Sequence, residues 1–337
     1  ERLVGSEMCI RDRYWILCPA GGVAGGWQLA MRSKSPYGPY EWKRVLERGK
    51  TTMNGPHQGG WIHTKYGEDW FIHFQDKGPY GRVCHLQPVD WSSGWPVMGN
   101  AGEPYWKFRK PKSDSKTIVN PVETDEFDSS KLGMQWQWQN DYKESYGQAT
   151  SMGFFRLFTY ALPELGDVSN LWYVPNMLLQ KTPADEFTAT TKLSFCSRNS
   201  DQYVGLVCMS AEYSSVGLQR TEDGYELQIR HNPNAMRTHL TDEVLTVDTL
   251  KPTQKGTPRK GRPAEMHIKD VYLRMSIKDS KVNYAYSIDG KKWKKAGGEY
   301  AMGKGRWIGS KIGFFAVDPN KTGRKGFIDI DWFRISR

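Results

Sequence analysis

The chain has 337 residues, which is long enough for two domains, and 13% of them are aromatic, with 14 Trp among them. Its formal net charge is +10, but no nucleic-acid reader motif accompanies that charge, which argues against a nucleic-acid-binding protein. No run of about 18 apolar residues occurs, so no membrane-spanning helix is expected.

Residues 1–13 differ from the rest of the chain, because they show neither clean alternation nor a turn signal. They resemble a stretch that recurs at the ends of unrelated conceptual translations, and they lack the apolar core of a signal peptide. We therefore expect a non-native junction without a native strand, and a native N-terminus that is missing from the chain.

The first predicted unit is a strand, a Gly-rich turn and a second strand. The strands are expected at residues 14–18 and 27–33. A shift of 55 residues lays this unit over residues 69–88 without a gap, with Trp15 over Trp70. A unit that recurs in this way is compatible with the blades of a β-propeller.

A Gly-Pro-His-Gln-Gly-Gly run at residues 55–60 opens the next unit. Pro56 lacks an amide donor, and the glycines would lose too much backbone entropy in a helix, so the run predicts a tight backbone path. This path would deliver the imidazole of His57 to the start of a strand. Two aromatic-rich strands follow at 69–75 and 81–88, separated by a turn that contains Gly and Pro.

Residues 107–120 are polar and contain Pro, which is typical of a linker. The character of the predicted strands also changes across this stretch. We therefore divide the chain into a first part at residues 14–111, a linker at 112–122 and a second domain at 123–337.

The second domain is predicted to consist of short strands without helical periodicity. Residues 271–278 and 282–287 alternate with period two, as strands with one buried face do. About eight or more such strands predict a sandwich of two sheets. The predicted strands are residues 154–160, 187–195, 203–210, 225–230, 271–277, 282–287, 311–316 and 326–335.

The five cysteines are odd in number and lack metal-ligand spacing. They predict free thiols, mostly buried in strands, rather than a disulfide framework.

The motifs of the first part occur in an order known from one propeller family. They are residues 55–59, 69–74, 81–88 and 94–96. In this order they resemble the last blades of the five-bladed propeller of glycoside hydrolase family 43, which contains β-xylosidases and α-L-arabinofuranosidases. The resemblance implies an all-β fold that begins with about two blades of a partial five-bladed β-propeller.

The second domain resembles the concanavalin A-like β-sandwich, or jelly roll, that follows the propeller in many family 43 β-xylosidases. The matching pieces are residues 125–128, a Gln-Trp-Gln-Trp run at 135–138, and residues 205–208, 286–293 and 327–333. Together the two resemblances cover nearly everything after Arg13.

The resemblance implies inverting hydrolysis of a glycosidic bond. This reaction needs a carboxylic acid and a carboxylate about 6.5–9.5 Å apart across the sugar. The family carries its two catalytic Asp and its general-acid Glu on the first three blades, which are expected upstream of this chain. We therefore assign no catalytic residue here, and we expect the chain to be a fragment that is inactive by itself.

Three residues are candidates for substrate binding. By resemblance, His57 lies at the propeller axis near the sugar, where the family often holds calcium or a water cluster; the alternative is a structural core histidine. Arg82 matches the substrate-contacting arginine of the family, and its planar donor fork suits hydroxyls or carboxylates; the alternative is a surface ion pair. Asp76 is the third candidate, with the capping of a turn as the alternative.

Asp125 and Asp331 are candidate metal ligands. They lie at opposite ends of the second domain, which would be adjacent in a closed sandwich, and related domains can bind calcium there. The alternative is a pair of ordinary acids at strand ends. The expected chemistry requires no cofactor, so a structural Ca²⁺ ion is the one cofactor considered.

The predicted function is exo-acting hydrolysis of xylan- or arabinoxylan-type oligosaccharides by a β-xylosidase or α-L-arabinofuranosidase. The alternatives are a non-catalytic carbohydrate-binding sandwich and a propeller interaction scaffold. The expected partner is a carbohydrate, without nucleic acid and without a membrane span. A secreted or periplasmic location is favoured over a cytoplasmic one, and the oligomeric state stays open.

Overall fold

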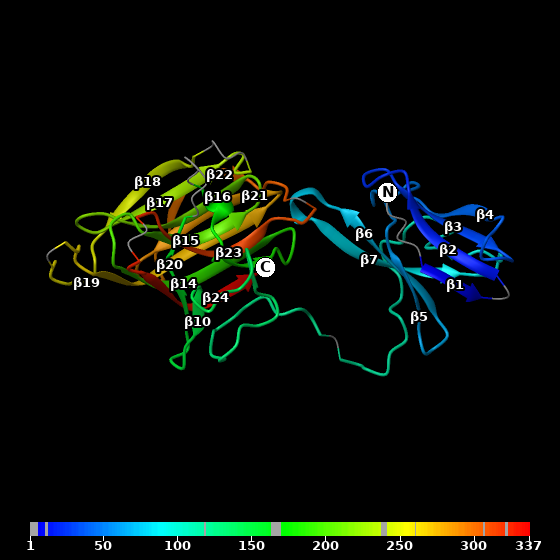
Figure 1. The fold of residues 1–337 in the computed structure, drawn as a ribbon, viewed down its shortest axis with the longest axis horizontal. Coiled ribbons are helices and arrows are strands. Elements are labelled where there is room, and N and C mark those ends of the chain that lie inside the picture. Colours follow the sequence, from blue (N-terminus) through cyan, green and yellow to red (C-terminus); the bar gives the residue numbers. More distant parts are fainter. Residues whose placement is uncertain are drawn as a thin grey trace. The chain divides into compact units, whose positions relative to one another are not determined.

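The computed structural model describes residues 6–10, 13–117, 119–162, 170–236, 241–259, 261–305, 307–320 and 323–337. The chain forms two compact units, Glu1–Val119 (unit 1) and Asn120–Arg337 (unit 2), and both are built from strands (Figure 1). The helices of the described residues are two single 3₁₀ turns, η1 (Gly78–Tyr80) and η2 (Leu171–Tyr173). Neither is long or apolar enough to cross a membrane.

The first sheet of unit 1 has four antiparallel strands in sequence order. They are β1 (Ser6–Ile10), β2 (Arg13–Ala20), β3 (Trp27–Ser33) and β4 (Glu41–Leu46). The expectation that residues 1–13 contain no native strand was wrong for β1, which pairs with β2 along its whole length. Residues 1–5, 11 and 12 of the proposed junction lie outside the described residues.

The second sheet of unit 1 repeats this meander. Its strands are β5 (Gly60–His63), β6 (Asp69–Asp76), β7 (Arg82–Asp90) and β8 (Val97–Met98). The 55-residue repeat is therefore present, but the register slips by one residue. Trp15 pairs with Arg32, so an exact 55-residue repeat would pair Trp70 with Gln87. Trp70 instead pairs with the next residue, Pro88, because the turn of the second hairpin is shorter than that of the first.

Three tryptophans pack together in the interior of unit 1. Trp15 is buried, and its ring meets the edges of Trp91 and Trp95 at centroid distances of 5.1 and 5.6 Å. Phe71 and Met98 from the second sheet belong to the same core. These rings therefore serve packing rather than a sugar-binding surface.

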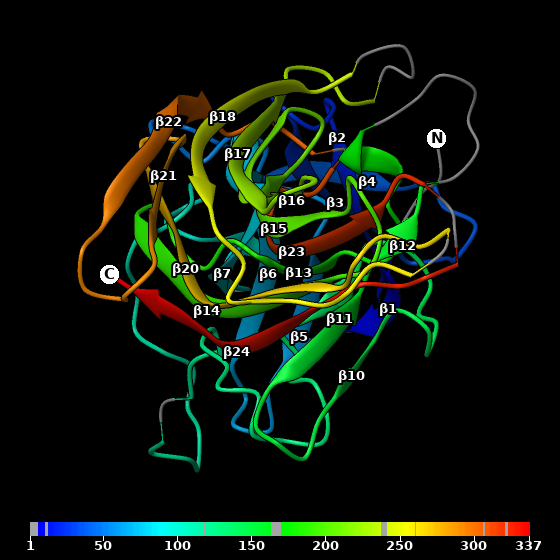
Figure 2. The same cartoon turned by 90° about the vertical axis from the view of Figure 1, so that its left-hand side faces the viewer.

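Unit 2 is a sandwich of two sheets, as predicted, and Figure 2 shows the two curved layers facing each other. One sheet has the order β10-β11-β24-β14-β20-β21-β22, with β19 paired to β20. Its strands are β10 (Gly147–Ala149), β11 (Phe155–Phe158), β14 (Phe187–Ser197), β19 (Gln254–Lys255), β20 (Met266–Lys278), β21 (Lys281–Ser287), β22 (Lys294–Ala301) and β24 (Phe327–Ser336).

The opposing sheet has the order β18-β17-β16-β15-β23-β13-β9, with β12 parallel to β23. Its strands are β9 (Gln137–Trp138), β12 (Tyr160–Ala161), β13 (Leu178–Lys181), β15 (Tyr203–Met209), β16 (Tyr213–Arg220), β17 (Tyr225–Asn232), β18 (Glu243–Leu250) and β23 (Lys311–Asp318). Phe314 of this sheet contacts Phe333 of the first sheet at 5.6 Å between ring centroids, which joins the layers.

Besides β1 and the two- or three-residue strands β8, β9, β10 and β19, the sequence analysis missed β4, β13, β16, β18 and β22. Their apolar alternation is weak: the first four residues of β4 are exposed, and β22 contains two consecutive glycines. These strands form because a neighbouring strand offers its hydrogen-bonding edge, and no local pattern records that edge. The single strand predicted at 154–160 is divided between β11 and β12, which belong to different sheets.

Candidate functional site

His57 lies in the turn before β5, and only 2% of its surface is exposed. Its Nδ1 lies 2.7 Å from the carbonyl oxygen of Gly55. Because a carbonyl oxygen only accepts hydrogen bonds, Nδ1 is the protonated nitrogen, and Nε2 is an acceptor when the ring is neutral.

Two glycines make room for this imidazole. A Cβ on Gly26, in the turn between β2 and β3, would lie 2.4 Å from His57 Nε2. Gly55 has φ of +49°, and a Cβ there would lie 2.1 Å from the carbonyl oxygen of Val23. The tight backbone path predicted for residues 55–60 is therefore present, and it runs directly against the earlier hairpin turn.

Phe74 links His57 to Arg82. The ring centroids of His57 and Phe74 are 6.0 Å apart, and the guanidinium carbon of Arg82 lies 4.5 Å from the Phe74 centroid. Arg82 is exposed, and no ion pair involves it within the part of unit 1 that the structure describes. The structure thus brings two predicted site residues to one aromatic ring. Phe74 was not predicted, because its place in an aromatic-rich strand is equally typical of a core residue and only these two contacts mark it.

Asp76 lies beside this group but caps a turn. It pairs with Arg82 across the β6–β7 ladder, and its Oδ1 accepts a hydrogen bond from the Gly78 amide at 3.0 Å. Its backbone carbonyl accepts a further hydrogen bond from Asn54 Nδ2 at 3.1 Å. The capping role, which was the alternative for Asp76, is thus observed, and its contact with substrate stays a prediction.

The other face of β6 and β7 carries two stacked imidazoles, of which His73 is buried and His85 half-buried. His73 and His85 stack with centroids 5.5 Å apart, and His85 Nε2 lies 3.1 Å from Gln75 Oε1. Burial lowers the pKa of His73 to about 4, and it also lowers the pKa of His85. Both rings are therefore neutral at pH 7, and they serve as structural groups.

The other acids of unit 1 are engaged away from His57. Glu68 binds Arg109 at 2.6 Å and the Lys112 amide at 2.8 Å; this amide hydrogen bond is the main cause of its lowered pKa. Asp69 accepts from Trp61 Nε1 at 3.0 Å. Across the described residues of unit 1, no hydrogen bond or ion pair joins a carboxylate side chain to His57 or Arg82. The geometry supplies binding groups, and we assign no general acid or base in this chain.

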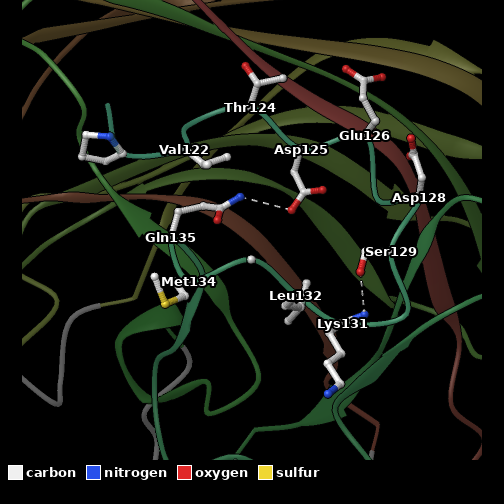
Figure 3. Close-up of a pocket in the computed structure, with 12 residues that line it drawn as sticks. Val122, Thr124, Asp125, Glu126, Asp128, Ser129, Lys131, Leu132, Met134 and Gln135 are labelled. Atoms are coloured by element: carbon white, nitrogen blue, oxygen red, sulfur yellow. Dashed lines mark hydrogen bonds between the residues drawn. The ribbon is translucent and has the colours of Figure 1, made fainter. Parts of the chain in front are cut away.

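Unit 2 contains a pocket of about 870 Å³ lined by residues 121–135 (Figure 3). Two of its three acidic groups have partners. Asp125 Oδ2 accepts from Gln135 Nε2 at 3.2 Å and from Trp136 Nε1 at 2.8 Å. Glu126 forms a two-point pair with Arg334 of the last strand, with both hydrogen bonds at 2.8 Å. These contacts give both acids a structural role.

Asp331 lies at a β-bulge where the register of β24 against β14 shifts, and its carboxylate pairs with Lys192 at 2.9 Å. Asp125 pairs with Phe333 through an isolated bridge, so the two chain ends are adjacent as predicted. Among the described residues, however, the one cluster of three potential metal ligands is Cys196, Glu265 and His267. Within the described ranges, no third potential ligand forms such a cluster with Asp125 and Asp331, and their metal role stays a prediction.

Comparisons with known proteins match both units. Residues 124–336 match the family model described as the Beta xylosidase C-terminal Concanavalin A-like domain, and residues 8–96 match Glycosyl hydrolases family 43. A putative beta-xylosidase of Xylanibacter ruminicola is 33% identical over 307 residues, which cover 89% of this chain and 52% of that protein. A non-reducing end alpha-L-arabinofuranosidase of Bacteroides ovatus is 25% identical over 297 residues, which cover 83% of this chain and 51% of that protein. The chain spans about half the length of these curated relatives.

Solved structures share the fold. The xylan beta-1,4-xylosidase from Bacillus halodurans has a TM-score of 0.80 at 19% identity, covering 99% of this chain and 64% of that chain. A GH43 protein from Bacillus licheniformis has a TM-score of 0.79 at 24% identity, and the match covers 98% of this chain and 64% of that chain. The predicted order of propeller blades followed by a concanavalin-like sandwich is confirmed.

Proposed function

The chain belongs to glycoside hydrolase family 43, and from this membership we propose that it serves in the hydrolysis of terminal β-xylosyl or α-L-arabinofuranosyl groups. The observation that carries the proposal is the match of both units to this family, together with 33% identity to a relative named as a putative beta-xylosidase. Because another relative is named as an arabinofuranosidase, the proposal includes both the xylosyl and the arabinofuranosyl group as the sugar that is released. These named relatives favour the hydrolase over the non-catalytic sugar-binding alternative.

The geometry supports a substrate-positioning role for this chain. Arg82 is exposed and unpaired by carboxylates, so its five N–H donors are available to sugar hydroxyls or to a catalytic carboxylate. Stacking on Phe74 restricts the guanidinium, so less side-chain entropy is lost on binding. His57 is fixed by its Nδ1–H bond to Gly55 and by the close turn at Gly26, which leaves Nε2 as the polar atom of a rigid ring.

Inverting hydrolysis also needs an acid and a base about 6.5–9.5 Å apart. The described acids of unit 1 bind other partners, and Asp76 caps its own turn. We therefore propose that this chain supplies binding and orientation, and we predict background rates for the 337-residue chain assayed alone. Calcium binding and a secreted or periplasmic location stay predictions.

The test is an assay of the natural gene product that contains this chain, on aryl β-D-xyloside and aryl α-L-arabinofuranoside. Turnover of at least one substrate is expected, with inversion at the anomeric carbon followed by NMR. A folded gene product that hydrolyses neither substrate, nor unlabelled xylo- and arabino-oligosaccharides, would overturn the proposal. Turnover by the 337-residue chain alone would contradict the proposal that this chain supplies binding and orientation but neither the general acid nor the general base.

A further inference from the structure

The cluster of Cys196, Glu265 and His267 lies on the outer face of the sandwich. Cys196 of β14 and His267 of β20 are direct cross-strand partners, and Cys196 Sγ lies 3.4 Å from His267 Nε2. Their neighbours Phe195 and Met266 are buried on the inner side. Because successive side chains of a strand alternate between faces, Cys196 and His267 both point outward.

Glu265 completes the cluster. It precedes His267 by two residues and so lies on the same face, and its Oε1 lies 2.8 Å from His267 Nε2. Its other oxygen, Oε2, accepts a hydrogen bond from Arg198 Nε at 2.8 Å. The ligand atoms of Cys196, Glu265 and His267 all lie within 4.8 Å of one another.

This arrangement differs from a nucleophilic Cys-His-acid triad. In such a triad the two imidazole nitrogens have separate partners, one facing the nucleophile and the other facing the orienting carboxylate. Here the thiol and the carboxylate both face Nε2. Burial, with a smaller contribution from Glu265, also raises the pKa of the Cys196 thiol to about 12, whereas a reactive cysteine has a lowered pKa.

We propose that Cys196, Glu265 and His267 form a three-ligand site for Zn²⁺. A thiolate and an imidazole favour a borderline-soft divalent ion over the hard ions Ca²⁺ and Mg²⁺. Binding would release the thiol proton to solvent and move the imidazole proton from Nε2 to Nδ1 by exchange with solvent, which frees the Nε2 lone pair for the ion. The hydrogen bond between His267 and Glu265 would then be replaced by two metal bonds. The negative charges of the thiolate and the carboxylate balance the ion.

The surroundings fit this ion. The Glu265 and His267 side chains are 38% and 28% exposed, which leaves an entry path and a fourth position for water. Arg198 holds the second oxygen of Glu265, an outer contact of the kind that orients metal-binding carboxylates. The ion would tie β14 to β20, a role separate from glycoside hydrolysis.

The test uses the 337-residue chain with Zn²⁺ alone and with Co²⁺ as a spectroscopic probe. Wild type is expected to bind one Zn²⁺ per chain and to melt at a higher temperature when Zn²⁺ is added. With Co²⁺ it should show a thiolate charge-transfer band and the visible bands of a four-coordinate ion. Cys196→Ser should abolish the charge-transfer band, and His267→Gln or Glu265→Gln should weaken Zn²⁺ binding at least about 10-fold.

His231→Gln is the matched control, because His231 also contacts two glutamates, Glu212 and Glu243, but no thiol. It should leave Zn²⁺ binding unchanged. A charge-transfer band that survives Cys196→Ser, or equal Zn²⁺ affinity in wild type and His267→Gln, would overturn the site. If Cys196→Ser fails to fold, the two solvent-facing variants at Glu265 and His267 decide the matter.

Discussion

The two units bury their sheets in different ways. In unit 2, β15 is buried at all seven positions, because the opposing sheet covers one face and the segment that contains Leu171 and Val174 covers the other. In unit 1, Ile72 and Leu86 are partners across β6 and β7, yet they remain 39% and 37% exposed. A sandwich closes on itself, whereas a propeller blade needs neighbours on both faces. Unit 2 therefore contains its own stabilising core, and unit 1 presents polar groups and an open apolar sheet face.

The core of unit 2 should show the largest effect of a single substitution. Phe314 is fully buried, and its ring contacts Phe333 of the opposing sheet and Trp136, which precedes β9. Phe314→Ala should lower the free energy of unfolding of unit 2 by about 3–5 kcal/mol, because it leaves a cavity between the sheets. Urea denaturation measures this change. Phe108→Ala, at a 43% exposed ring of unit 1, is the control and should cost less than about 1 kcal/mol. An equal loss of unfolding free energy in both variants would contradict the view that only unit 2 has a core enclosed on both faces.

Arg82 tests whether unit 1 is organised for binding. In the natural gene product, Arg82→Ala should raise the transition-state free energy by about 2–4 kcal/mol through loss of a positioned donor. The measurement is kcat/KM on the aryl glycosides, beside a thermal melt that should hardly change. Arg44→Ala is matched, since Arg44 also stacks on an aromatic ring, that of Trp27 at 4.2 Å. A kcat/KM of Arg82→Ala within threefold of wild type would show that Arg82 does not contribute to substrate binding or turnover.

The buried imidazole of His73 should make unit 1 sensitive to acid. Its pKa is about 4 when folded and near 6.5 when unfolded, so below pH 6.5 the unfolded state binds more protons. Stability should fall between pH 6.5 and pH 4, with a loss of about 2 kcal/mol at pH 5. Comparison of urea denaturation of unit 1 at pH 7.5 and pH 5 measures this loss.

Two variants isolate the contribution of His73. His73→Gln should reduce the loss by that amount, whereas His63→Gln, at the exposed histidine that contacts Asp69, should keep it. An unchanged loss in His73→Gln would assign the acid sensitivity to other groups.

The smallest effect is expected from cleavage between the units. The predicted linker at residues 112–122 contains the division at Val119 and Asn120, and it has no strand among its described residues. Limited proteolysis there should release a resistant piece that ends at Arg337. Its free energy of unfolding should lie within about 0.5 kcal/mol of the value in the intact chain, because the sandwich core is internal. Progressive digestion without a resistant piece would contradict the independence of unit 2.

Sequence reasoning succeeded where the local pattern and the final packing agree. The strand predicted at 27–33 coincides with β3, and four described cysteines, Cys18, Cys84, Cys196 and Cys208, are free as expected. It failed at the edge strands β4 and β22, whose pairing depends on a neighbour. It also overlooked Phe74, because an aromatic residue in a strand is ordinarily a core residue and only its contacts with His57 and Arg82 mark it as part of the site.

The sequence by itself determined the strand-rich character, the hairpin turns and the order of the two units. Periodicity, Gly and Pro positions and motif order are local properties that survive without coordinates. The tertiary structure alone decided that Gly26 makes room for His57 and that Cys196 meets His267 across two strands. The second contact depends on strand register, because a shift of one residue would turn each side chain to the opposite face. Register is fixed by the packing of both sheets together, so it could not be obtained from any one stretch of the chain.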